Sequence, residues 1–168
     1  MWRRWLFLGL LPIIILATGC QATGTGAIPS LLFPGDKATF GFIAVSDATG
    51  LTQDFSGSYH DPQGQTAIGI VDVAFKGVGG LQKCQPGVDP ACAQAPNNVK
   101  GGCYVGLALQ YQSQNPNIPG SGTFFLLACD VDGTGGNGTD FLLITVESGP
   151  YTGYSNAGTP SGNLTVTL

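Results

Sequence analysis

After its first nineteen residues the chain contains no arginine, no tryptophan and no methionine. In that part of the sequence four lysines stand against nine aspartates and one glutamate, which gives a formal charge of −6. Proteins bind nucleic acid largely by neutralising its phosphates with lysine and arginine. The composition therefore excludes nucleic acid as a partner.

Residues that commonly carry catalysis are also scarce. His60 is the only histidine and Glu147 the only glutamate, and no Gly-x-Ser-x-Gly motif is present. Nucleophilic catalysis needs a base beside an activated nucleophile, and glycoside hydrolysis needs a tuned pair of carboxylates. We therefore expect no catalytic residue and no enzyme. A hydrolase that gathers His60 with nearby aspartates is the third and weakest alternative.

A helical period is missing, and short β-branched and aromatic runs recur instead between clusters of Gly, Pro, Asn and Asp. Such spacing is typical of antiparallel all-β domains. It predicts an all-β fold, a single antiparallel β-sandwich or barrel of about seven to eight strands. The predicted strands are Ala38–Val45, Phe55–His60, Ala67–Phe75, Cys103–Tyr111, Thr123–Val131, Phe141–Val146 and Asn163–Leu168.

The N-terminal segment has the three parts of an export signal. Arg3 and Arg4 precede an apolar stretch, Leu6–Leu16, and small residues follow it. A membrane-spanning helix needs about 20 apolar residues, so this stretch is short for a span and suits a secretory signal. We interpret residues 1–19 as a signal peptide. An uncleaved anchor or a buried helix is the alternative.

Leu16-Ala17-Thr18-Gly19-Cys20 resembles the lipobox of bacterial lipoproteins, although Ala17 stands where that family prefers leucine. The resemblance implies a lipid anchor on Cys20, which would carry diacylglycerol and fatty acyl chains such as palmitate. It also implies the outer membrane or cell surface rather than the inner membrane, because Gln21 replaces the aspartate that signals retention. Cleavage by an ordinary signal peptidase would instead leave Cys20 as a free thiol.

Residues 20–34 lack a period and are rich in Gly, Thr, Ala and Pro. Such composition is typical of flexible linkers. We expect a lipidated N-terminus and tether there, followed by one β domain over residues 35–168.

Several short pieces of that domain resemble the post-COAP-1 family of bacterial extracellular modules. The resemblance implies an accessory β domain without known catalysis, and it transfers no functional residues. The matching pieces are Asp36–Phe42, Ser58–Asp61, Asp132-Gly133, Asp140-Phe141, Gly149–Tyr154 and Gly162–Leu164.

The four cysteines that remain after Cys20 form an even set in an exported chain, which indicates two disulfides. They are Cys84, Cys92, Cys103 and Cys129. Zinc is the alternative, but it usually needs closer ligand spacing than these gaps. Residues 82–102, which hold two of the cysteines and three prolines, are expected to form a long loop stapled by its own disulfide. Such a loop is either functional or a plain insertion.

The pairing follows from a hairpin centred on residues 115–120. Such a hairpin places Cys103 opposite Cys129, and opposed residues lie within disulfide reach. It also places Val105 opposite Leu127 and Leu107 opposite Phe125. We predict Cys103–Cys129, and by elimination Cys84–Cys92.

The stretch 130–140 alternates oxygen-bearing residues with glycines, as calcium loops do. It departs from the EF-hand pattern, since the twelfth position holds Phe141 instead of glutamate. A glycine-rich hairpin turn is the plain alternative. The candidate metal ligands are Asp130, Asp132, Asn137 and Asp140.

These observations predict a membrane-anchored envelope lipoprotein whose β domain is a non-catalytic binding or structural module, with an envelope protein or a glycan as its partner. A calcium-stabilised glycan- or protein-binding domain is the alternative, and no cofactor other than calcium is expected. A tyrosine platform for sugars would support a glycan partner. The tyrosines are Tyr59, Tyr104, Tyr111, Tyr151 and Tyr154.

Overall fold

The computed structural model describes residues 21–30, 35–46, 52–62, 71–76, 80–133 and 139–167. The predicted signal peptide and Cys20 lie outside these residues. The described chain forms ten strands and one short 3-10 turn, Pro90–Cys92. The strands are β1 (Gln21–Pro29), β2 (Lys37–Ser46), β3 (Thr52–Asp61), β4 (Val71–Lys76), β5 (Gly80–Cys84), β6 (Gly102–Ser113), β7 (Ser121–Asp130), β8 (Phe141–Val146), β9 (Ser155–Gly158) and β10 (Asn163–Thr167).

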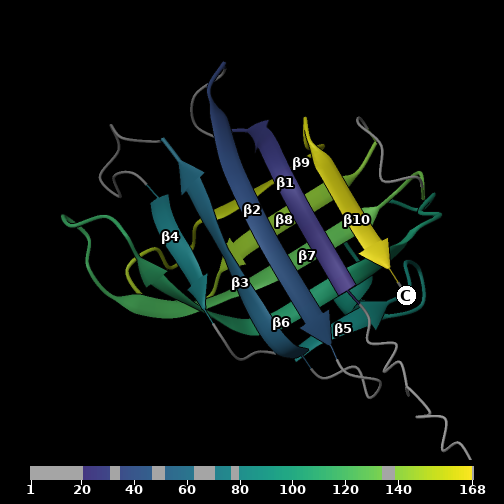
Figure 1. The fold of residues 1–168 in the computed structure, drawn as a ribbon, viewed down its shortest axis with the longest axis horizontal. Helices are drawn as coiled ribbons and strands as arrows, with labels where there is room; N and C mark the ends of the chain where they lie inside the picture. The colour runs from purple at the N-terminus through teal and green to yellow at the C-terminus, as the bar shows by residue number, and fades with distance from the viewer. Residues whose placement is uncertain are drawn as a thin grey trace, which may run out of the picture.

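All ten strands belong to one antiparallel sheet with the order β10-β1-β2-β3-β4-β6-β7-β8-β9, and β5 adds to β6. The sheet curls into a half-barrel (Figure 1). Strands β10, β1, β2, β3 and β4, here called the front layer, cross steeply over β6, β7 and β8 of the back layer. The predicted all-β antiparallel class is confirmed, with ten strands instead of seven to eight.

The main core lies between these two layers. Alternate residues of each strand point inward, as the period of two requires. The front layer contributes Phe40, Phe42 and Phe55, and the Phe55 ring packs against Phe124 of the back layer. The seven predicted strands supply most of this core, because their apolar residues repeat at strand spacing.

Residues 21–29 are not a tether, which corrects the prediction. They form β1 in the middle of the front layer, paired with β2 on one side and β10 on the other. Its inward positions near the start of the strand, Ala22 and Gly24, hold small residues, and a Cβ added at Gly24 would lie 2.8 Å from a ring atom of Phe42. The rings of β2 thus fill the space that a large side chain of β1 would occupy.

The predicted hairpin between β6 and β7 is confirmed at its cysteine end only. Cys103 pairs with Cys129 and Val105 pairs with Leu127, but the register shifts between Gly106 and Leu109. The predicted pairing of Leu107 with Phe125 is therefore wrong. A bulge causes the shift, and Ala108 adopts a left-handed backbone with φ of 51°. The bulge separates the half of β6 that pairs with β5 from the half that pairs with β4.

A buried polar network ties β3 to β9 and the turn before it. The Tyr154 hydroxyl donates to Asp61 Oδ2 at 2.5 Å and lies 2.6 Å from the Tyr59 hydroxyl. Asn156 Nδ2 donates to Tyr59 and to the carbonyl of Pro29 at the end of β1. Burial raises the pKa of both tyrosines, so their hydroxyls stay protonated. The network therefore holds β9, the strand next to β8, against the end of β1.

Candidate functional site

Three of the four predicted metal ligands converge at one end of the fold. Asp130 ends β7, Asp132 follows it, and Asp140 precedes β8. One carboxylate oxygen of each lies within 4.8 Å of the others. We call these three residues the acidic cluster. Asn137, the fourth predicted ligand, lies outside the described residues.

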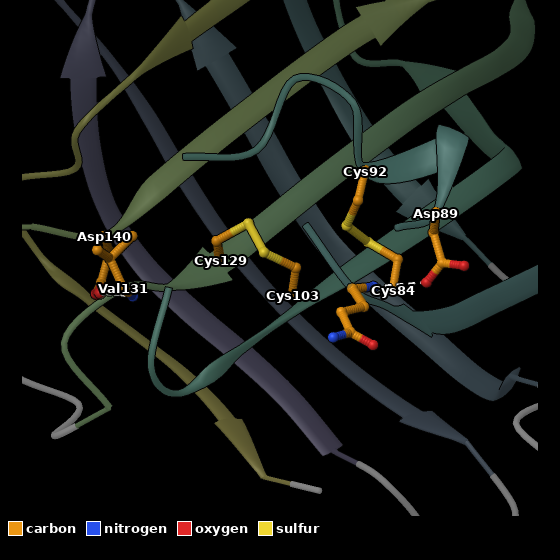
Figure 2. The surroundings of a disulfide bond; sticks show 8 residues. Cys84, Asp89, Cys92, Cys103, Cys129, Val131 and Asp140 are labelled. Carbon is orange, nitrogen blue, oxygen red and sulfur yellow. Dashed lines mark hydrogen bonds between the residues drawn. A yellow bond between two sulfur atoms is a disulfide. The ribbon is translucent and has the colours of Figure 1, made fainter. Parts of the chain in front are cut away.

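Backbone amides hold two of these carboxylates in place. Asp140 is fully buried and accepts hydrogen bonds from the amides of Val131 and Leu164, both at 3.2 Å. Val131 follows β7 in the back layer, whereas Leu164 lies on β10 in the front layer (Figure 2 shows Asp140 beside Val131). Asp130 Oδ1 accepts from the amide of Gly133 at 2.8 Å. One carboxylate therefore bridges the two layers.

The electrostatics of the cluster disfavour three negative charges. Burial is the main cause that raises the pKa of Asp140, and the nearby carboxylates of Asp130 and Asp132 raise it further. The two backbone hydrogen bonds act in the opposite direction. Chemically, the cluster offers hard oxygen donors, which calcium binds in sets of six to eight with carbonyls and water completing the set.

Both predicted disulfides are confirmed. Cys103–Cys129 joins opposed residues of β6 and β7, with Cα atoms 4.1 Å apart, and Cys84–Cys92 joins the end of β5 to the 3-10 turn, at 5.8 Å (Figure 2). All four cysteines are thereby used. The zinc alternative is wrong, because no thiolate remains among them.

The loop at 82–102 covers a second apolar cluster instead of being a plain insertion. Both disulfides pack there with Val105, Leu127 and Leu143, which face away from the main core. Ala91, Ala95 and Val99 of the loop pack against them. We call this the capped face. Because both of its faces are covered, the back layer reads in sequence as nearly continuous apolar runs.

The structure also places His60 and the five tyrosines. His60 lies 3.5 Å from Asp72 Oδ2 at the surface, whereas the adjacent Asp61 points into the core. The pair His60 and Asp61 therefore cannot act together. A tyrosine platform for sugars is also wrong, because every tyrosine is at most 7% exposed.

The outward surface of the front layer was not predicted as a candidate. Apart from its margins it carries small hydroxyl and apolar side chains, among which Ile43 and Val45 are 42% and 37% exposed. A hollow of about 440 Å³ lies elsewhere, beside the capped face, and Lys83, Lys100 and Asp89 line it. Because this lining carries both positive and negative side chains, its charge does not indicate a particular class of ligand.

Comparison with protein-family models, curated proteins and solved structures gave no match to this chain. Within the described residues no helix is both long and apolar enough to cross a membrane.

Proposed function

We propose that the chain is a bacterial envelope lipoprotein, anchored through a lipid on Cys20, whose β domain is a non-catalytic binding or structural module. The observation that supports it most is the position of the lipobox-like cysteine directly before the first strand, β1. The signal and cysteine thus precede a compact domain. The two disulfides suit an oxidising compartment outside the cytosol. The likeness to post-COAP-1 modules supports the accessory role.

Metabolic labelling with a fatty acid tests the anchor. The full chain and its Cys20→Ala variant are expressed in a bacterium, and label and membrane fractionation are measured for both. We expect the wild-type protein to carry label and to sediment with the outer membrane, since two acyl chains give stable anchoring. The Cys20→Ala variant should lose both properties. An unlabelled wild-type protein would contradict the proposal.

The partner, an envelope protein or a glycan, is sought by cross-linking in intact cells with the same two proteins. A partner captured with the anchored form and not with Cys20→Ala supports an assembly subunit. Binding of both forms to isolated envelope glycans supports glycan recognition instead.

A second candidate function is a calcium-stabilised binding domain, and the convergence of Asp130, Asp132 and Asp140 supports it. Thermal unfolding of the Cys20→Ala protein with calcium or chelator tests it. Binding at a hundredfold excess over Kd stabilises by about 2.7 kcal/mol, which raises Tm by several degrees. Asp132→Asn should abolish the rise, whereas Asp36→Asn, an exposed carboxylate elsewhere, should keep it. An equal Tm in calcium and chelator would exclude the candidate.

A further inference from the structure

Two exposed apolar side chains mark one end of the front layer. Ile43 and Val45 lie on β2 and face away from the core, whereas Phe42 and Ala44 point inward. Val45 pairs with Gln21, the first residue of β1, and Ile43 pairs with Thr23. The exposed apolar surface therefore lies at the end of the sheet where β1 begins.

Covalent geometry places the anchor close to this surface. Opposed residues of antiparallel strands have Cα atoms about 5 Å apart. Consecutive Cα atoms are about 3.8 Å apart. Since Gln21 already pairs with Val45, the Cα of Cys20 must lie within about 9 Å of the Cα of Val45. No linker separates a lipid on Cys20 from the domain.

A lipid on Cys20 would hold this end at the bilayer surface. The polar headgroup region on each side of the hydrocarbon core is about 5–8 Å thick. A side chain tied within about 9 Å of the lipid attachment point thus sits at headgroup depth, where apolar and amphipathic residues are buried partly. Ile43 lies two residues beyond Val45, about 7 Å farther along the strand.

The chemistry around the two side chains suits an uncharged contact. Their neighbours across β1 and β10 are Gln21, Thr23 and the threonines at 165 and 167. The acidic residue in these rows is Asp54, whose backbone pairs with Val45. Neither Ile43 nor Val45 pairs directly with a lysine, and the lysine in the row of Ile43 is Lys76, two strands away on β4 beyond Ser56 of β3. Attraction of a neighbouring lysine to anionic lipids therefore does not drive the contact.

We propose that Ile43 and Val45 rest on the bilayer that holds the lipid of Cys20, so that the β domain stands on the membrane by this end of its front layer. The inference rests on the proposed lipid anchor. It adds a defined orientation: the far ends of β1 and β2, near Lys37, point away from the membrane. The contact is apolar and should not depend on salt.

Tryptophan fluorescence tests this orientation cleanly, because the chain has no tryptophan after residue 19. Ile43→Trp and Val45→Trp are made in the lipidated protein and reconstituted into phosphatidylcholine vesicles with brominated or ordinary acyl chains. Thr39→Trp is the matched control. It is exposed on the same face of the same strand, but it pairs with Ala27, about 20 Å farther from the start of β1.

We expect brominated lipid to quench Ile43→Trp and Val45→Trp at least twofold more than Thr39→Trp, at low and high salt alike. Equal quenching of all three would mean that the domain lies flat, and quenching of none would mean that it stands clear of the bilayer. Either result overturns the orientation while fatty-acid label on the same protein still supports the anchor. Absence of the label removes both proposals together.

Discussion

Asp140→Asn tests whether one buried carboxylate holds the two layers together. In the wild-type protein its two oxygens accept from the amides of Val131 and Leu164, on opposite layers. An asparagine keeps one acceptor oxygen and turns an NH₂ group toward the other amide. One buried amide then loses its partner, which costs about 1–3 kcal/mol.

Relief of repulsion from Asp130 and Asp132 offsets part of this cost, so we expect a net loss of about 2 kcal/mol. For a chain of this length the corresponding fall in Tm is roughly 4–8 °C. Urea unfolding of the Cys20→Ala protein in calcium-free buffer measures it. Asp132→Asn, which removes the same charge from a half-buried position, is the control and should change stability by less than about 0.5 kcal/mol.

Unfolding of Asp140→Asn at the wild-type urea concentration would refute the reasoning, because both amides would then have found other acceptors. A loss of stability that occurs in calcium and disappears with chelator would also refute it. That result would assign the stabilisation to a bound ion instead of the two amide hydrogen bonds.

Three further predictions follow from the described contacts. The pKa of Asp140 is raised above its usual 3.8, so the charged form of this side chain disfavours folding. As the pH falls through the folded-state pKa toward 3.8, the free energy of unfolding of the wild-type protein should therefore rise relative to that of Asp140→Asn. Replacing Cys84 and Cys92 by serine opens a loop with a sequence separation of 8 and should cost about 2.5 kcal/mol in denaturant unfolding; a loss below about 0.5 kcal/mol would contradict this. Tyr154→Phe removes the hydroxyl that donates to Asp61 and should lower stability by about 1–3 kcal/mol, with unchanged Tm as the contrary result.

The strands that sequence could predict are those whose inward residues are large and apolar. β2, β7 and β8 read clearly for this reason, because rings and branched side chains repeat along them. The two disulfides were predictable as well, since the hairpin register alone brings Cys103 opposite Cys129.

The strands that sequence missed bury small or polar side chains. β1 buries Ala22, Gly24 and Ile28, with Gly24 against the rings of Phe40 and Phe42, so Ile28 is its one large apolar residue facing the core and the strand has little hydrophobic signal. β9 has four residues and buries Asn156, whose amide protons are accepted by the Tyr59 hydroxyl and a backbone carbonyl. The sequences of β1 and β9 therefore resemble loop sequences, and only their pairing with neighbouring strands identifies them as strands.

Some features of the candidate sites were likewise predictable from the sequence, and others were not. The spacing of Asp130, Asp132 and Asp140 around a turn was sufficient to bring them together. The exposure of Ile43 and Val45 was not predicted, because alternation shows which residues of a strand share a face but not which face is the outer one when both carry apolar residues. The bulge at Ala108 left no signal, since alanine rarely adopts a positive φ.

The pairing of β1 with β10 joins the first strand of the domain to the last. β1 can pair with the neighbouring strand β2 early in folding, but its other edge stays open until Asn163–Thr167 is available to pair with it. Contacts so far apart in sequence form slowly, and an open strand edge invites pairing with other chains. The pairing of β10 with β1 therefore decides when this edge of the sheet closes. Removal of β10 would expose this edge of β1 and would also take Leu164 and Val166 out of the core and the Leu164 amide away from Asp140.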